Sequence, residues 1–131
     1  MLMEKSLIPG IEGRKEIVVT SDKLATAFGS GTVEVFATPA MIVLMEQTAM
    51  ESVSGFLPEE FVSVGTEVSV KHFKATLLGK TVVCNSKLLT IDDKKLVFEV
   101  VASDEKGIIG KGQHTRYIVD KQLFINNLMD K

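Results

Sequence analysis

The sequence predicts an α+β protein in which a curved antiparallel sheet wraps around one long buried helix. The segment 40–53 is rich in helix-forming residues, and its first six residues are all apolar, as in helices that other parts of a protein enclose. Four β-like runs with short connections follow this segment, and short connections favour antiparallel pairing. Because one layer of sheet covers only part of a helix, we expect a second copy of the chain to complete the burial or extend the sheet.

Length and composition fit one folded domain over residues 1–131. Hydrophobic residues make up 45% of the chain and charged residues 24%, as in globular rather than disordered proteins. The net charge of −2 and the aromatic content of 6% disfavour a nucleic-acid partner, which needs a basic face. The apolar run 40–45 is too short for a membrane span, and the N-terminus lacks the apolar core of a secretory signal. We therefore expect a soluble, cytoplasmic protein, in keeping with the single cysteine, Cys84.

Short and irregular elements are expected before the long helix. Residues 1–15 contain a proline and two glycines and are expected to form an irregular lead-in, followed by a short strand at 16–20. Residues 21–24 are expected to open one helical turn, with Ser21 or Asp22 as its cap. Two glycines predict a flexible loop over 28–31, and β-branched and aromatic residues predict a strand over 32–36.

The long helix has its own start and stop signals. Thr38 is a favourable N-cap residue, and Pro39 suits the first helical position, where the missing N–H costs nothing. Gly55 favours a stop just after residue 53.

The remainder of the chain predicts a four-strand meander and a short terminal helix over 120–131. Turn residues separate the four β-like runs, which cover residues 62–73, 80–91, 95–102 and 108–119. Gly110 and Gly112 interrupt the last run, which predicts a bulge or a close approach of another backbone.

Glu46 is the first candidate for chemistry. It follows the apolar run, and its neighbours at helical spacing include Ile42 and Met50, so an ionised carboxylate there loses hydration. The alternative is that Glu46 lies where the helix emerges into water, since Gln47 and Glu51 are polar.

His72 is the second candidate. Strand alternation places it at the end of a row that faces the buried helix, and this row contains Val64, Thr66, Val68, Val70 and His72. An imidazole beside a carboxylate forms a general acid/base pair near neutral pH. The alternative is a core histidine satisfied by one hydrogen bond.

The other candidates have simple structural explanations. Capping alone explains Thr38, although the free N–H groups of a helix start also suit an anion. His114 and Arg116 alternate onto one face of the last run, and Arg116 suits a phosphate or carboxylate if it is not a solvated edge charge. Cys84 is expected to be a buried apolar residue. No Cys/His spacing indicates a metal, and no glycine-rich phosphate motif is present, so we expect no metal and no cofactor.

Four segments together resemble the fluoroacetyl-CoA thioesterase-like family of hotdog-fold proteins. They are ATPAMIVLME at 37–46, VGTEVSVKH at 64–72, LVFEV at 96–100 and IGKGQHTR at 109–116. The resemblance extends from about residue 31 to residue 119. It implies the hotdog fold and a catalytic set that falls on Thr38, Glu46 and His72. It also implies substrate contacts at Gly65, through its backbone, and at Arg116.

The resemblance further implies an assembly and a reaction. Hotdog proteins generally act as dimers with thioester sites near the subunit interface, so we expect a homodimer or a dimer of dimers in which His72 can serve the Glu46 of either chain. The implied reaction is hydrolysis of an acyl-CoA to a carboxylate and free CoA. The family's phenylalanine-lined lid precedes the helix, where this chain has Phe28 alone in the segment 21–32. We therefore expect a short- or medium-chain acyl-CoA rather than fluoroacetyl specificity.

Two other functions fit the same residues. One is a hotdog dehydratase acting on a 3-hydroxyacyl thioester, which eliminates water and leaves the thioester intact. The other is a non-catalytic acyl-CoA-binding protein. The coincidence of Thr38, Glu46 and His72 at the family's spacing favours the thioesterase.

Overall fold

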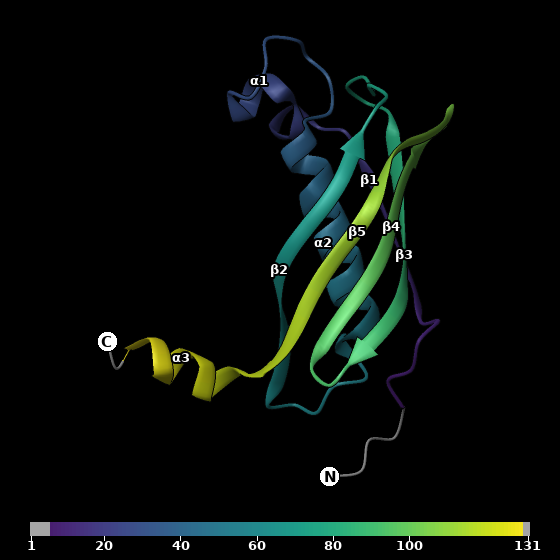
Figure 1. Cartoon of the computed structure of the whole chain (residues 1–131). Coiled ribbons are helices and arrows are strands. Elements are labelled where there is room, and N and C mark those ends of the chain that lie inside the picture. Colours follow the sequence, from purple (N-terminus) through teal and green to yellow (C-terminus); the bar gives the residue numbers. More distant parts are fainter. Residues whose placement is uncertain (1–5, 130–131) are drawn as a thin grey trace.

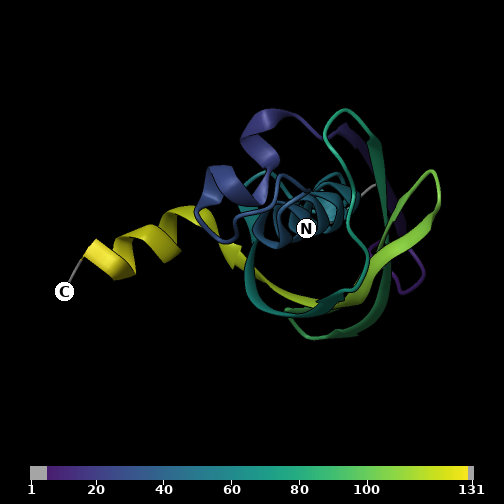
Figure 2. The ribbon, with the colours of Figure 1, turned by 90° about the horizontal axis from the view of Figure 1, so that it is seen from above.

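The computed structural model describes residues 6–129 and contains one antiparallel sheet that curves around a long helix (Figure 1). The helix α2 spans Thr38–Ser54, and the strands that follow it are β2 (Phe61–His72), β3 (Thr81–Asp92), β4 (Lys95–Asp104) and β5 (Gly107–Asp120). The expected α+β architecture is therefore present. Seen from above, the sheet forms an open trough with α2 inside it (Figure 2).

The five strands are ordered β1-β3-β4-β5-β2, where β1 is Glu12–Val18. β3, β4 and β5 form a meander as expected, but β2 pairs with β5 and not with β3. The connection between β2 and β3 is too long for a tight hairpin, and it is held to another segment, because the N–H of Phe36 donates to the carbonyl of Thr76. β2 is an edge strand, because it is the last strand in this order and pairs only with β5.

The core lies between α2 and the concave face of the sheet. Met41, Leu44, Met45, Ala49 and Val53 of α2 are buried there. Side chains from every second position of β3 and β4, all apolar except Ser86, lie on the same face, in keeping with the two-residue period of strands. Cys84 is one of these buried residues and carries a free thiol, as expected.

Glycine allows the helix to approach β5 closely. A methyl carbon at Gly110 would lie 2.6 Å from the sulfur of Met41 and 2.8 Å from the carbonyl oxygen of Lys71. The predicted close backbone approach in this run is therefore confirmed at Gly110.

The N-terminal predictions need correction. β1 begins at Glu12, so the expected lead-in over 1–15 is wrong for its last four residues, while residues 1–5 lie outside the described part. Three charged residues, Glu12, Arg14 and Glu16, lie on the exposed side of this edge strand. Their charges make the segment look irregular when it is judged by composition alone. The expected helical turn is present as a 3₁₀ helix, η1 (Ser21–Lys23), but its N-cap residue is Thr20 rather than Ser21 or Asp22.

The segment between η1 and α2 also differs from expectation. A short helix, α1 (Ala25–Phe28), ends at Gly29, whose φ is +68°, so Phe28 is helical rather than part of a loop. The strand expected over 32–36 does not form, and only isolated bridges link Phe36 to Leu24 and Val35 to Leu77. This segment turns across the end of the sheet and has no continuous neighbour strand with which to pair.

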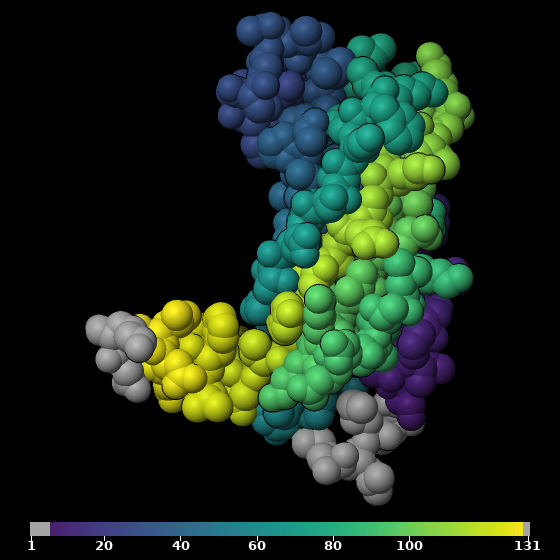
Figure 3. All heavy atoms as spheres, in the orientation of Figure 1, coloured from purple at the N-terminus to yellow at the C-terminus, as the bar shows by residue number. Residues whose placement is uncertain are grey.

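The C-terminal helix α3 (Lys121–Met129) is present as expected and projects from the body of the molecule (Figures 1 and 3). On α2, the side facing away from the sheet leaves Val43 46% exposed and Met50 38% exposed. One chain therefore encloses only part of this helix. Within residues 6–129, no helix combines the length and apolar character needed to cross a membrane.

Candidate active site

The start of α2 and the end of β2 bring Thr38 and His72 into contact. The hydroxyl Oγ1 of Thr38 lies 2.8 Å from Nδ1 of His72. Ala37, in an extended conformation, is the N-cap residue, and Thr38 is the first residue of the helix. The prediction that Thr38 caps the helix is therefore wrong, as is the placement of Pro39 at the first helical position. The hydroxyl of Thr38 forms a hydrogen bond with Nδ1 of His72 instead.

His72 lies on the concave face of the sheet, as strand alternation predicts. The edge of its ring faces Phe36, with ring centroids 6.2 Å apart and planes inclined by 75°. Nε2 is buried and has no hydrogen-bond partner among residues 6–129. Burial lowers the pKa of His72 from its ordinary value of 6.5, so the imidazole is neutral at pH 7 and has one ring nitrogen available for a further partner.

A cavity of about 300 Å³ adjoins this pair. Its walls come from the segment before α2, the first residue of α2 and the end of β2; the lining residues include Ala25, Ser30, Phe36, Thr38, His72 and Phe73. The volume is at the small end of the range typical of ligand pockets. Phe28 does not line this cavity. It lines a separate one of about 320 Å³ beside Val43 and Gln47 on the outer side of α2.

A bulge in β2 changes which residues face the helix. The register against β5 shifts between Gly65 and Glu67, leaving Thr66 as the extra residue. Before the bulge, Ser63 and Gly65 face the interior, and after it Val68, Val70 and His72 do so. The expectation that Val64 and Thr66 share the face of His72 is therefore wrong, because an extra residue reverses the alternation.

The bulge places Gly65 beside Glu46. A methyl carbon at Gly65 would lie 2.9 Å from Oε2 of Glu46 and 3.3 Å from Nη1 of Arg116. The charge of Glu46 acts on both Arg116 and His114. Glu46 is half-buried. It is thus neither fully enclosed by apolar residues nor fully exposed to water, the two alternatives that the sequence allows. Its environment is a polar cluster under the sheet.

Arg116 is a buried and firmly held cation rather than a solvated edge charge. Its side chain is 6% exposed. Its Nε and Nη2 groups donate to the hydroxyl and the carbonyl of Ser63, both at 2.8 Å. Burial lowers the pKa of Arg116, but an arginine retains its charge at neutral pH. Arg116 can therefore present a fixed positive charge beside Gly65.

His114 and Ser63 are parts of this cluster that the sequence did not identify as site residues. Nε2 of His114 lies 3.1 Å from Nη1 of Arg116, and Nδ1 lies 2.8 Å from the carbonyl of Glu67. Arginine donates only, so Nε2 accepts and Nδ1 donates, which makes His114 neutral. The alternation of His114 with Arg116 is a sequence signal for this pair. Nothing comparable identifies Ser63, because the bulge is not visible in the sequence.

One chain keeps the two parts of the predicted catalytic set apart. Thr38 and Glu46 belong to the same helix but are eight residues apart, which corresponds to about 12 Å along the helix axis. Thr38 contacts His72 at one end of the trough, whereas Glu46 lies beside Gly65 further along it. In residues 6–129, no group of three or more His, Cys, Asp or Glu side chains is placed to hold a metal ion.

Most of the chain matches a family of enzymes. Residues 19–122 match the family model described as fluoroacetyl-CoA-specific thioesterase. The chain belongs to this family. A curated relative, the fluoroacetyl-CoA thioesterase of Streptantibioticus cattleyicolor, is 34% identical over 91 residues, which are 70% of this chain and 66% of the relative. The aligned segment thus covers slightly less than two thirds of that protein.

Solved structures of the family and fold agree along nearly the whole chain. The structure of the fluoroacetyl-CoA thioesterase FlK superposes with a TM-score of 0.89 at 27% identity, covering 97% of this chain and 98% of that one. A hot-dog-like protein from Thermanaerovibrio acidaminovorans gives a TM-score of 0.86 at 25% identity, covering 93% and 90%. The hotdog fold and the family inferred from four short segments are both confirmed.

Proposed function

We propose that this protein hydrolyses the thioester of a short- or medium-chain acyl-CoA, releasing a carboxylate and free CoA. The observation that carries the proposal is the contact between Thr38 and His72 at a cavity of about 300 Å³, in a chain of a thioesterase family. The small volume favours a short acyl group. The buried free thiol of Cys84 suits a reducing compartment, and we propose the cytoplasm as the location.

In the proposed mechanism, Glu46 takes a proton from water while the water oxygen adds to the thioester carbonyl carbon. Direct attack by the carboxylate on that carbon is the alternative route. The carbon–sulfur bond then breaks, and the sulfur receives a proton that passes through His72. Thr38 orients the imidazole through Nδ1, and the backbone near Gly65 stabilises the negative charge that develops on the carbonyl oxygen. Arg116 provides a fixed cation for the carboxylate or the substrate.

We further propose that the active form is a homodimer whose site combines residues of both copies. The separation of about 12 Å between Thr38 and Glu46 along one helix supports this arrangement. The outer side of α2, with Val43 and Met50 exposed, provides an apolar surface for a second copy. This side of the molecule runs along the edge strand β2, between the projecting α1 region and α3 (Figure 3). A dimer formed along it can bring the Glu46 of one copy towards the Thr38–His72 pair of the other.

The experiment that tests the activity measures free-thiol release from a panel of acyl-CoAs, from acetyl-CoA to palmitoyl-CoA. We expect release from the shorter members and a fall of about 10²- to 10⁴-fold in Glu46→Gln, the usual contribution of a general base. Glu51→Gln is the matched control, because it removes a carboxylate from the exposed side of the same helix, where it pairs with Lys15. The control should retain activity.

Two outcomes of this experiment would replace the proposal. If no substrate releases thiol while a 3-hydroxyacyl-CoA loses water, the protein is a dehydratase on the same fold. If acyl-CoA raises the melting temperature without any turnover, the protein is a binder, because a ligand that binds only the native state stabilises it.

A further inference from the structure

The outer face of the sheet carries two lysines that face each other without a counter-charge. Lys71 of β2 and Lys111 of β5 are direct partners in the antiparallel register. Like charges in this position destabilise a sheet. Across residues 6–129, neither ammonium group lies within 4.0 Å of a carboxylate oxygen. Repulsion between the two lysines therefore destabilises the sheet locally, and a bound anion would reduce this repulsion.

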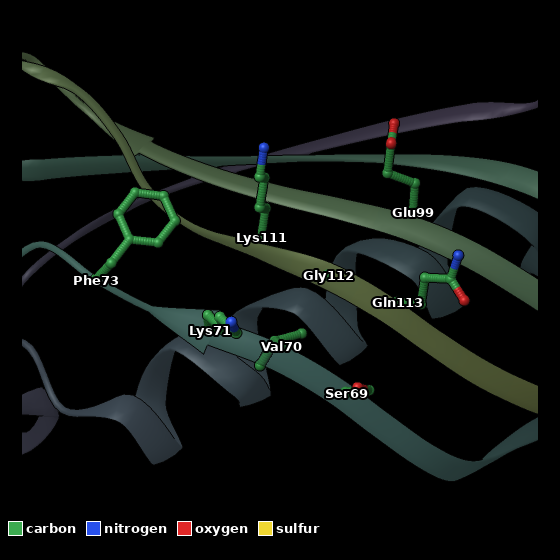
Figure 4. A pocket seen from close by; sticks show the side chains of 8 residues that line it. All are labelled: Ser69, Val70, Lys71, Phe73, Glu99, Lys111, Gly112 and Gln113. Carbon is green, nitrogen blue, oxygen red and sulfur yellow. The ribbon is translucent and has the colours of Figure 1, made fainter.

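These lysines line a cavity of about 480 Å³ on the convex side of the sheet. Ser69 and Gln113 supply polar groups to its wall, and Phe73 supplies an aromatic ring. Figure 4 shows the side chains of Lys111 and Phe73 standing on the same side of the sheet, with Lys71 on the neighbouring strand β2. The site thus has two cations, hydrogen-bonding groups and one exposed aromatic ring.

Glu99 is the one acidic residue of this cavity. In the register of β3 and β4 it lies opposite Lys87, and opposite charges in this position attract. Among residues 6–129, Glu99 forms no ion pair within 4.0 Å with Lys87 or with either lysine of the cavity, so the two lysines of the lining outnumber its single carboxylate and the lining keeps a net positive charge.

Phe73 connects this cavity to the proposed active site. It is the residue after His72, it is 56% exposed, and it lines both the cavity of the lysines and the cavity of Thr38 and His72. His72 points to the concave face and Phe73 to the convex face, as successive residues of an extended chain do. A long ligand can therefore lie across Phe73, with one end at His72 and the other at the lysines.

We infer that Lys71 and Lys111 form a binding site for the phosphate groups of the acyl-CoA, reached past Phe73 from the thioester site. This inference rests on the proposed function. It assigns the residues that would distinguish a CoA thioester from a thioester without phosphate groups. Lysine binds phosphate as a compact point charge. The pantetheine arm, which is uncharged, spans the edge of β2 between the two cavities.

The test compares wild type with Lys71→Gln/Lys111→Gln, which keeps most of the side-chain length and removes both charges. Binding of free CoA and of pantetheine is measured by calorimetry, and hydrolysis is measured with an acyl-CoA and the matching acyl-pantetheine. We expect the Kd for CoA and the KM for acyl-CoA to rise about tenfold, as for two solvent-screened ion contacts. The kinetics with acyl-pantetheine should not change. The difference in Kd for CoA between wild type and the variant should shrink as salt is added.

Two further variants make the result specific. Lys94→Gln/Lys121→Gln removes the same total charge from exposed positions outside this cavity and should bind CoA as wild type does. Lys71→Arg/Lys111→Arg keeps the charge and should retain the affinity. An unchanged affinity for CoA in the double glutamine variant would overturn the inference, as would an equal loss with acyl-pantetheine.

Failure of the inference can be distinguished from failure of the proposed function. If wild type releases thiol but its affinity for CoA does not depend on the lysines, the lysine site is wrong and the thioesterase stands. If CoA binds through the lysines and no thioester is cleaved, the site stands and the proposed hydrolysis is wrong.

Discussion

The carboxylate of Glu46 lies so close to the backbone of Gly65 that a side chain at this position would displace it. A methyl carbon at Gly65 would lie 2.9 Å from Oε2 of Glu46, closer than real carbon–oxygen contacts of this kind. Glycine at this position therefore determines where the carboxylate can lie, and the β-bulge after it determines that Gly65 faces the helix.

Gly65→Ala should reduce turnover while leaving the fold intact. The atom that the new methyl group meets first is the end of a flexible side chain, so the protein can adjust by moving the carboxylate of Glu46. His114 and Arg116, whose nearest atoms would lie 3.1 and 3.3 Å away, need to shift by only a few tenths of an ångström. Misplacing a reacting group by about 1 Å can lower the rate about 10²-fold. We expect a fall in kcat of this order, measured by thiol release, with a melting temperature close to that of wild type.

Gly55→Ala is the matched control for this variant. Gly55 has a right-handed helical conformation at the end of α2, and a methyl carbon there would have no neighbour within 4 Å. Its turnover should equal that of wild type. Wild-type turnover in Gly65→Ala would show that the carboxylate does not act from the position it has in the structure.

Thr38→Val should lower activity without destabilising α2. The valine keeps the shape of the side chain and removes the hydroxyl that contacts Nδ1 of His72. Because Ala37 is the N-cap residue, the loss of about 1 kcal/mol that follows removal of a side-chain cap is not expected. Steady-state kinetics should show a lower kcat, while urea unfolding gives a midpoint like that of wild type.

Thr38→Ser provides the counterpart, because it restores the hydroxyl and should recover most of the activity. A drop in the urea midpoint of Thr38→Val as large as that of a lost cap would contradict the assignment of Thr38 to His72.

The main elements could be predicted because their apolar residues follow the period of the structure they form. The all-apolar start of α2 and the alternation within β3 and β4 are both visible in the sequence. Most of these residues are buried in the fold, although Val43 of α2 is exposed. β1 was placed too late because its exposed side carries Glu12, Arg14 and Glu16. The strand expected over 32–36 has a suitable composition, but its isolated bridges show that it lacks a neighbour strand.

The site was predictable residue by residue but not as a geometry. Composition and spacing identify Glu46 and His72, and the alternation of the last strand pairs His114 with Arg116. The bulge at Thr66 depends on how β2 and β5 align over their whole length, so the sequence does not reveal that Ser63 and Gly65 face inwards. The contact of Thr38 with His72 joins residues that are far apart in the chain, and local helix signals favour the capping role instead.

Mixing two inactive variants tests whether the proposed site combines two copies. A heterodimer of Glu46→Gln and His72→Ala contains one intact site if Glu46 and His72 come from different copies, and none if they come from the same copy. With two affinity tags to isolate the heterodimer, we expect about half of the wild-type thiol release per dimer, as two-fold symmetry requires. Each variant alone should be inactive. An inactive heterodimer of the correct mass would contradict the shared site.

Two neutral histidines should make the stability of the fold depend on pH. Burial is the main cause that lowers the pKa of His72 and of His114 from the ordinary value of 6.5. For His114, the charge of Arg116 lowers the pKa further, whereas the contact with Glu67 and the charge of Glu46 act in the opposite direction. The unfolded chain thus takes up these protons at a higher pH than the folded chain does.

The free energy of unfolding should therefore be highest above pH 6.5 and should fall as the pH is lowered through and below that value, because protons then bind the unfolded state first. Asp22 and Asp104, whose pKa values are lowered from 3.8, titrate below this window. Urea unfolding at about pH 7.5 and about pH 5.5 measures the effect. His72→Gln and His114→Gln should each show a smaller difference between the two conditions than wild type. If both variants retain the full wild-type difference, other groups cause it, and the two histidines do not resist protonation in the folded protein.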